Sequence, residues 1–299
     1  MEKLRLALDW TPNINHIGFF VAKEKGFYHE LGLAVDLIDP AVDNYSLTPA
    51  KKVELGVADF ALCPTESIIS YRTKDNPFDL IAIAAVLQED LSAIVVKSDA
   101  GINSPKDLDG KTYSSYKARY EDAIVREMIK NDGGKGAIEI SYPDKLGIWN
   151  TLLDGKADAT WIFLNWEGIE AQALSSKLSY FKMRDYQIPY SYSPVIAASE
   201  GKTLKNRDAY RSFLNASKKG YLYCRDAPEA AIEILNKFVP QSDRKINLKA
   251  ALDISLPHFG NEMTWGTMDS KTISNFLDWI KAKGLETSNI SISEMAINL

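Results

Sequence analysis

Hydrophobic and polar positions in the first part of the chain fall into blocks that alternate between two periodicities. Apolar residues alternate or run together over 4–10, 33–39 and 58–62, which predicts strands, and they recur at helical spacing over 17–26 and 48–56. Strands that alternate with helices in this way are typical of a βαβαβ unit, and such units build parallel sheets. The first block is therefore predicted to form one α/β layer structure.

The same order returns in the middle of the chain. The pattern predicts strands over 111–116, 137–143 and 157–163, with helices over 121–130 and 145–155 between them. The second block agrees with the first in the order and in the size of its elements. Two similar α/β lobes are the simplest arrangement for such a sequence.

A short motif marks the same point in both blocks. Gly56 is followed two and three residues later by Ala-Asp and then by an apolar strand, and Gly155 is followed in the same way, so that Asp59 corresponds to Asp158. A glycine directly after a helix supplies the left-handed cap that turns the chain back toward a sheet. The repeat therefore predicts two equivalent helix-to-strand returns.

The strand-like stretches 91–98 and 194–199 flank the second block and are the candidates for two hinge crossovers. On this interpretation lobe two comprises residues 94–194, and lobe one is discontinuous and comprises residues 1–93 and 195–299. The C-terminal part is mostly helical, with helices expected over about 205–224, 227–238, 246–254 and 269–283. A cleft between two lobes is a common place for a small ligand.

Composition narrows the class of protein. The 299 residues are 45% hydrophobic and 25% charged with a net charge of −5, which suits a globular protein and argues against nucleic-acid binding. No apolar run is long enough to insert in a membrane. Two cysteines, Cys63 and Cys224, favour free thiols, and the start at Met1 shows no secretory signal, so a cytoplasmic location is expected. Were Met1 not the native start, the expectation would be a periplasmic or extracellular protein. The oligomeric state is left open.

Polar and aromatic residues gather in the loops that follow the predicted strands, where parallel α/β sheets bind their ligands. The candidate ligand-binding residues are Trp10, Asn13, His16, Cys63, Thr65, Glu66, Ser67, Tyr116, Tyr120, Asn165, Trp166, Glu167, Tyr190 and Tyr192. Aromatic faces stack on planar rings, and carboxylates accept hydrogen bonds from ring N–H or amino groups. The set therefore predicts a small aromatic, nitrogen-bearing ligand.

Structural roles remain open for several of these residues. Trp10 could belong to the core at a strand end, Ser67 and Thr65 could cap a helix, and Glu167 could serve the dipole of a helix that begins beside it. Tyr190 and Tyr192 could be ordinary packing at a hinge, and a lone histidine such as His16 is more often structural.

Signatures of catalysis are missing from the chain. His16, His29 and His258 lie far apart without metal-ligand spacing, and there is neither a G-x-S-x-G elbow nor a G-x-G-x-x-G turn after a strand. We therefore expect no metal, no cofactor and no catalytic residue, with an enzymatic activity left undecided.

The opening stretch LRLALDWTPNINHIGFFVAKEKGFYHELGL closely resembles the thiamine-pyrimidine family, in which a strand is followed by W-x-P-N-x-x-H. The resemblance continues through GVADFAL, DGKADAT and NWEGIEAQAL and covers most of residues 3–200. The family includes precursor-binding proteins and a cytosolic fungal pyrimidine synthase, all with the two-lobed periplasmic-binding-protein fold. The resemblance implies that fold, a mostly parallel sheet flanked by helices in each lobe, and a thiamine-pyrimidine-like ligand in the cleft.

The chain departs from the fungal synthase at three points. The resemblance places Cys63 where the synthase has the lysine that binds pyridoxal phosphate. It places Ser67 where the synthase has a histidine that is consumed as substrate, or Glu66 if the alignment is shifted by one residue. The late cysteine-rich iron motif is also missing. These departures favour a binding protein. The alternatives are an enzyme of pyrimidine precursor biosynthesis that uses other residues, with Lys117 as the candidate for a Schiff base, and a ligand-sensing regulatory protein.

Overall fold

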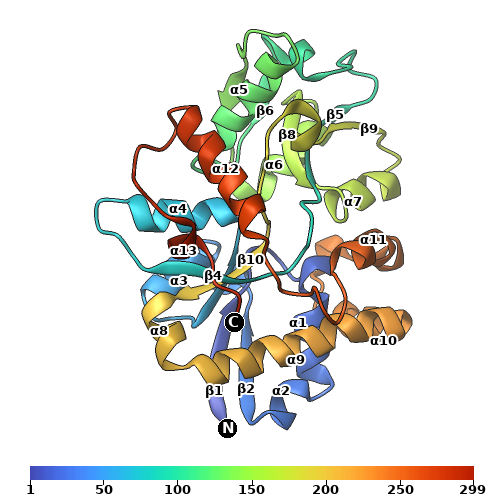
Figure 1. The fold of residues 1–299 in the computed structure, drawn as a ribbon. Coiled ribbons are helices and arrows are strands. Elements are labelled where there is room, and N and C mark those ends of the chain that lie inside the picture. The colour runs from blue at the N-terminus through green and yellow to red at the C-terminus, as the bar shows by residue number, and fades with distance from the viewer. The chain divides into compact units, whose positions relative to one another are not determined.

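The computed structural model describes residues 1–299 and divides the chain into two compact units. The first unit comprises Met1–Asp90, Ser191–Ser274 and Ser288–Leu299, and the second comprises Leu91–Tyr190 and Asn275–Thr287. Each unit holds its own five-stranded sheet with helices packed against it (Figure 1). The fold is α/β and of the periplasmic-binding-protein type.

The first unit has a sheet with strand order β2-β1-β3-β10-β4. Its strands are β1 (Glu2–Ala7), β2 (Leu33–Ile38), β3 (Phe60–Cys63), β4 (Leu80–Ala85) and β10 (Val195–Ser199). β1 pairs in parallel with β2 and β3, whereas β10 is antiparallel to both of its neighbours, β3 and β4. Its helices are α1 (Ile17–Glu24), α2 (Phe27–Glu30), α3 (Pro49–Glu54), α4 (Thr65–Thr73), α8 (Glu200–Lys205), α9 (Arg207–Asp226), α10 (Pro228–Asn236), α11 (Leu248–Ser255) and α13 (Ile292–Met295).

The second unit repeats this topology with the order β7-β6-β8-β5-β9. Its strands are β5 (Ser92–Lys97), β6 (Thr112–Ser114), β7 (Glu139–Ser141), β8 (Ala159–Phe163) and β9 (Leu178–Phe181), and its helices are α5 (Glu121–Asn131), α6 (Ile148–Leu153) and α7 (Glu167–Ala173). β6 is parallel to β7 and β8, and β5 is antiparallel to β8 and β9. In each unit, therefore, a single antiparallel strand occupies the fourth position of an otherwise parallel arrangement.

The repeated Gly-x-Ala-Asp motif makes the same hydrogen bonds in both units. Gly56 and Gly155 have φ angles of 70° and 71°. The carboxylate of Asp59 accepts a hydrogen bond from the backbone N–H of Arg5 at 2.9 Å, and that of Asp158 accepts one from Thr112 at 2.8 Å. Each aspartate thus ties the strand that it precedes to the parallel neighbour of that strand, β1 in the first sheet and β6 in the second, so the motif has the same role in both units.

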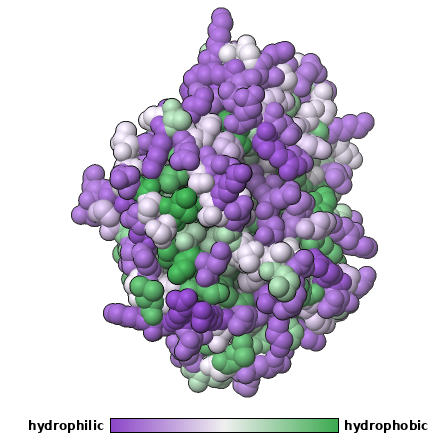
Figure 2. All heavy atoms as spheres, viewed as in Figure 1, coloured by the Kyte–Doolittle hydropathy of each residue, from purple (hydrophilic) through white to green (hydrophobic).

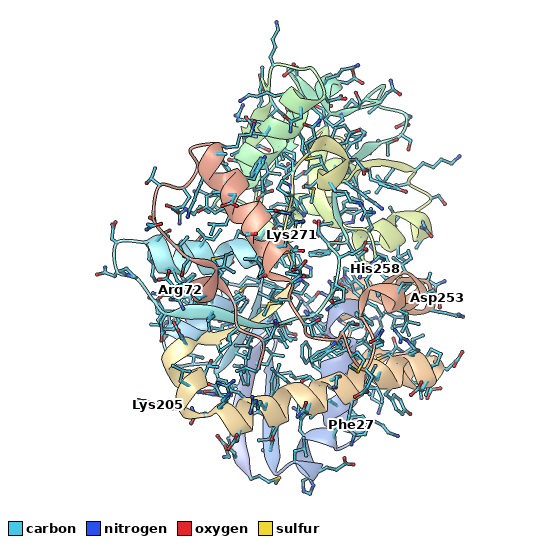
Figure 3. The ribbon with its side chains drawn as sticks, in the orientation of Figure 1. Phe27, Arg72, Lys205, Asp253, His258 and Lys271 are labelled. Carbon is cyan, nitrogen blue, oxygen red and sulfur yellow. The ribbon has the colours of Figure 1, made fainter.

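Helices cover the first sheet through close contacts. α9 lies alongside α1 (Figure 1), and a Cβ atom on Gly220 would stand only 1.9 Å from the carbonyl oxygen of Gly18. Phe27, labelled in Figure 3, packs its ring against Tyr223 of α9 with 6.3 Å between centroids. On the face shown in Figure 2, polar residues predominate and apolar residues form smaller patches between them. No helix has both the length and the apolar character of a membrane span.

The predicted division of the chain agrees with the structure near the two flanking stretches and differs in the C-terminal part. The chain passes between the units at 90/91 and 190/191, beside the stretches 91–98 and 194–199, which contain β5 and β10 of the two sheets; that these stretches act as hinges stays a prediction. In the C-terminal part, α12 (Ser270–Ala282) begins in the first unit, but residues 275–287 belong to the second, whereas the prediction assigned all of 195–299 to lobe one. The chain therefore crosses between the units four times, not twice.

Candidate functional site

The loop after β1 holds a carboxylate that is oriented by a histidine. His16 has no exposed side-chain surface, and its Nε2 lies 2.7 Å from Oδ1 of Asp9. Its other ring nitrogen, Nδ1, accepts a hydrogen bond from the backbone N–H of Asn13 at 3.3 Å. Because Nδ1 is an acceptor, the proton of the neutral ring lies on Nε2 and is donated to Asp9. This arrangement fixes the Asp9 carboxylate, whose side chain is still 23% exposed.

Asn13 and His16 therefore stabilise the conformation of this loop. The side-chain oxygen of Asn13 caps η1 (Ile14–His16) by accepting the N–H of Asn15 at 2.9 Å, and its amide nitrogen donates to the carbonyl of Thr11 at 3.0 Å. Both residues are buried, and their polar atoms point to the loop itself. Both residues hold the loop and Asp9 in the structure, and direct ligand contact stays a prediction for both.

The loop after β3 brings a second carboxylate and a thiol to the same region as Asp9. Cys63 is buried and its thiol forms a hydrogen bond with Ser67. Burial raises the pKa of that thiol to about 12, and the negative charges of Asp9 and Glu66 add to the effect. The raised pKa disfavours the thiolate, which is the form that a nucleophilic cysteine needs.

Thr65 is buried and bonded to the segment before β10. Its backbone N–H and its hydroxyl both donate to the carbonyl of Tyr192, at 3.0 and 2.7 Å. The hydroxyl of Tyr192 in turn accepts the N–H of Asp269 at 2.8 Å. Thr65 and Tyr192 therefore join the start of α4 to the segment before β10, whereas the N-cap of α4 is Pro64 and not Thr65.

Trp10 lies beside an aromatic ring that sequence reasoning missed. The ring centroids of Trp10 and Tyr45 are 5.4 Å apart with an interplanar angle of 59°. Tyr45 follows η2 (Pro40–Asp43) and has a left-handed φ of 60°, directly after Asn44 with a φ of 53°. Burial raises the pKa of Tyr45 to about 12, and Asp39 and Asp243 raise it further. A positive φ is uncommon for a tyrosine, so the position of Tyr45 beside Trp10 was hard to predict from the sequence.

In the second unit, the loop after β6 is organised by Glu121. Tyr116 is half-buried, and its pKa is raised well above the usual value by burial and by the charges of Glu167 and Glu121. Tyr120 is buried and donates its hydroxyl to the carboxylate of Glu286 at 3.0 Å, beside Arg119. Of the two predicted tyrosines, therefore, Tyr116 lies at the end of the sheet and Tyr120 binds an internal partner.

The loop after β8 is more buried than the prediction assumed. Asn165 has no exposed surface, and Trp166 is 3% exposed at the start of α7. The carboxylate of Glu167 accepts the backbone N–H of Phe163 at 3.0 Å, which closes the loop onto the end of β8. Tyr190 packs edge-on against Trp161 with 5.2 Å between ring centroids. Glu167 lies near Tyr116, so these two predicted residues do come together.

The predicted residues thus form two groups, one at the end of each sheet. In the first unit they are Trp10, Cys63, Glu66 and Ser67, to which the structure adds Asp9 and Tyr45; in the second unit they are Tyr116, Asn165, Trp166 and Glu167, to which it adds Glu121. No group of three or more metal-binding side chains is placed to hold an ion. Both groups offer aromatic rings beside carboxylates, which suits a ring with hydrogen-bond donors.

Comparison with known proteins identifies the family. The family model described as "NMT1/THI5 like" matches residues 13–231, well over half of the chain. The chain belongs to the NMT1/THI5-like family. This confirms the resemblance seen in the opening motif and its continuation through the middle of the sequence.

Two curated relatives of this NMT1/THI5-like chain carry different names. It is 25% identical to a formylaminopyrimidine-binding protein of Halalkalibacterium halodurans, over 94% of this chain and 86% of the relative. It is 22% identical to a 4-amino-5-hydroxymethyl-2-methylpyrimidine phosphate synthase of Legionella pneumophila, over 80% of this chain and 75% of the relative. A Candida albicans gene product with the generic periplasmic binding protein structural fold superposes with a TM-score of 0.72 at 14% identity, over 100% and 98% of the two chains.

The residues of this NMT1/THI5-like chain do not fit pyridoxal phosphate at the place that the resemblance indicates. A Schiff base needs an amine, and the position after β3 carries the buried thiol of Cys63. Lys117, the alternative, is exposed, and its ammonium lies over the ring of Tyr142 at 5.4 Å from the centroid. No step through the cofactor is therefore derived for this chain.

Proposed function

We propose that this protein binds a small nitrogen heterocycle of the thiamine-pyrimidine class without transforming it. The observation that carries the proposal is the pair Asp9 and Trp10, in which a carboxylate held by His16 stands next to an aromatic face. An aminopyrimidine has a flat ring to stack and an amino group to donate, and the pair offers a partner for each. The name of the Halalkalibacterium halodurans relative supports this class of ligand.

Glu66 completes the same group in the proposal. It is 5% exposed and lies close enough to Cys63 for its charge to raise the pKa of the thiol, as Asp9 also does. Two carboxylates around one buried region favour a ligand with several N–H donors or a positive charge.

The experiment is calorimetric titration of the protein with formylaminopyrimidine and with 4-amino-5-hydroxymethyl-2-methylpyrimidine. Asp9→Asn should weaken binding by about tenfold or more, because it replaces a charge-assisted hydrogen bond, which is worth roughly 1.5–3 kcal/mol. Trp10→Ala should weaken it similarly, and Trp10→Phe should retain most of the affinity since a ring remains.

Asp253→Asn is the matched control for the change at Asp9. Asp253 is exposed on α11, where it pairs only with the exposed Lys249, and it is labelled in Figure 3. The same chemical change there should leave the affinity unaltered. Equal affinities for the wild type and Asp9→Asn would overturn the proposed role of Asp9. A visible absorbance band with pyridoxal phosphate that disappears in Lys117→Ala would instead favour an enzyme.

A further inference from the structure

Two polar side chains of the first unit are enclosed by the protein without a hydrogen-bond partner. Trp265 is 6% exposed and Ser191 is 2% exposed. Neither Nε1 of Trp265 nor Oγ of Ser191 has a hydrogen-bond partner within the chain. Buried polar groups in native proteins nearly always have a partner, because an unpaired donor has lost its hydrogen bond to water without replacement. Both groups are therefore available to a partner from outside the chain.

Trp265 and Ser191 lie at the edge of the first sheet that also carries Asp9. The backbone N–H of Ala85, the last residue of β4, donates to the carbonyl of Gly266 at 3.0 Å, so Trp265 lies beside the end of β4. Ser191 precedes β10, which runs antiparallel to β3 and β4, whereas β1 is parallel to β3. The start of β10 and the ends of β1, β3 and β4 therefore share one edge, and α/β sheets bind ligands at this carboxyl edge.

One tyrosine connects the ring of Trp265 to the loop that holds Asp9. The rings of Trp265 and Tyr221 lie against each other, with 5.3 Å between their centroids and an interplanar angle of 31°. The hydroxyl of Tyr221 donates to the carbonyl of Asn15 at 2.5 Å, within the loop whose His16 binds Asp9. Burial raises the pKa of Tyr221 well above its usual value, and the negative charge of Asp9 is among the further causes. Trp265 therefore belongs to the surroundings of the Asp9 carboxylate.

The segment that carries Trp265 is held in place by hydrogen bonds. The backbone N–H of Gln88 donates to the carbonyl of His258, which is labelled in Figure 3, at 2.7 Å. The side-chain oxygen of Asn261 accepts the backbone N–H of Thr264 at 3.1 Å. These bonds fix the backbone around the indole. Because its N–H is enclosed by protein atoms, we expect neighbouring side chains to shift when a ligand binds to it.

The indole and the hydroxyl supply what the carboxylates of the proposed site lack. Ionised Asp9 and Glu66 can only accept hydrogen bonds, whereas the indole N–H only donates and a serine hydroxyl can donate. An aminopyrimidine carries both kinds of group, an amino group that donates and ring nitrogens that accept. A site with a carboxylate and a neutral donor would therefore distinguish this ring from a benzene ring of the same shape.

We propose that Trp265, together with Ser191, donates the hydrogen bonds that bind the ring nitrogens of the heterocycle. The inference rests on the proposed function, because it adds donors to the ligand site formed by Asp9 and Trp10. All four residues belong to the first unit. Their combined effect is a preference for a nitrogen heterocycle over a carbocycle of the same shape.

The test compares two ligands that differ only in the ring nitrogens. The protein is titrated with 4-amino-5-hydroxymethyl-2-methylpyrimidine and with 2-amino-4-methylbenzyl alcohol, in which both ring nitrogens are replaced by CH. The wild type should prefer the pyrimidine by at least about tenfold. Trp265→Phe keeps a ring against Tyr221 and should weaken pyrimidine binding by about three- to tenfold, with much less effect on the benzyl alcohol. Ser191→Ala should act in the same direction.

Matched controls separate the loss of a donor from the loss of packing. Trp149→Phe removes a buried indole, also with an unpartnered Nε1, from the core of the second unit, and it should leave the pyrimidine affinity unaltered. Ser191→Ala should keep the melting temperature of the wild type, because no bond within the chain is lost. Ser255→Ala should lower it, because the hydroxyl of Ser255 donates to the carbonyl of Ala251 at 2.7 Å.

A second measurement observes the indole directly. In proton–nitrogen correlation spectra the Nε1–H signal of Trp265 is the one that Trp265→Phe removes, and it should move downfield on saturation with the pyrimidine but not with the benzyl alcohol. Equal pyrimidine affinities of the wild type and both variants, or an unmoved Trp265 signal, would overturn the inference and leave the proposed function standing. Failure of the wild type to bind the pyrimidine would reject the proposed function and the inference with it.

Discussion

At the scale of single residues, the sequence placed the candidate residues in the loops that follow the strands, but it could not give the direction of their side chains. Trp10, Asn13 and His16 were all predicted from one motif, yet His16 turns inward to Asp9 and Asn13 caps its own loop. A polar residue that hydrogen-bonds to the backbone and one that binds a ligand can be of the same residue type and can have the same spacing in the sequence. Asp9 and Tyr45 were missed because their roles depend on a tautomer and on two positive φ angles.

His16 should contribute to stability through both of its ring nitrogens. His16→Phe keeps a ring in the buried position but leaves the N–H of Asn13 without an acceptor and Asp9 without its donor. We expect a loss of about 1–3 kcal/mol in the free energy of unfolding, measured by chemical denaturation. His29→Phe is the control, because His29 lies on the exposed surface of α2. Equal stability of the two variants would show that the His16 bonds are weak.

At the scale of elements, the local pattern predicted eight of the ten strands and most helices, and the repeat predicted the equivalence of the two blocks. Two strands were missed. β4 reads LIAIAA and is buried at all six positions, so it has no alternation of polar and apolar residues to reveal it. β9 reads LSYF and has a single buried position, Phe181, so it shows no apolar run. The antiparallel insertion of β5 and β10 depends on partners far away in the sequence, which local periodicity does not encode.

The contact of α1 with α9 depends on the absence of a side chain at Gly220. A Cβ atom there would approach the Gly18 carbonyl oxygen to 1.9 Å, so the helices would have to separate. Gly220→Ala should therefore lower the free energy of unfolding by more than about 2 kcal/mol, despite the better helix propensity of alanine.

Gly168 provides the matched control within another helix. A Cβ atom added at Gly168 would lie 3.7 Å from its nearest neighbour, which is an ordinary van der Waals contact. Gly168→Ala should leave the stability unchanged or raise it by up to about 1 kcal/mol. Thermal and chemical unfolding of the two variants side by side would check both values, and a tolerated Gly220→Ala would contradict the close packing.

At the scale of the whole molecule, the sequence pattern predicted boundaries near 93 and 194, and the structure divides the chain after Asp90 and after Tyr190. The larger error concerned the C-terminal helix. A helical pattern indicates that α12 exists but does not indicate which sheet its later residues join. The contacts of Glu286 show why the residues after Ser274 join the second unit. Its carboxylate accepts hydrogen bonds from Arg119 and Tyr120 of that unit.

Loss of Glu286 should weaken the second unit selectively. Glu286→Ala leaves the buried hydroxyl of Tyr120 without its acceptor, which costs roughly 1–3 kcal/mol. Hydrogen exchange should then show faster exchange of amides in α5, with those of α9 unchanged. Uniformly faster exchange in both helices would mean that residues 275–287 stabilise the two units equally.

The stability of the protein should fall on the alkaline side because buried acids ionise only after unfolding. The pKa of Cys63 is raised from 9.0 to about 12, and those of Tyr45 and Tyr210 are raised from 10.0 to about 12, in each case mainly by burial. Above pH 9 the unfolded chain releases these protons while the native chain keeps them, so the unfolded state binds fewer protons and the free energy of unfolding decreases as the pH rises toward 12.

Cys63 offers a way to isolate one contribution to this decrease. By pH 11 its thiol alone should account for on the order of 2 kcal/mol, since each pKa unit corresponds to about 1.4 kcal/mol. Denaturation of the wild type and of Cys63→Ala at pH 7.5, 9.5 and 11 would measure it, because the variant should start less stable and lose less as the pH rises. Parallel curves for the two proteins would mean that the thiol of Cys63 ionises in the native state as readily as in the unfolded chain, and that it is open to solvent at the end of β3.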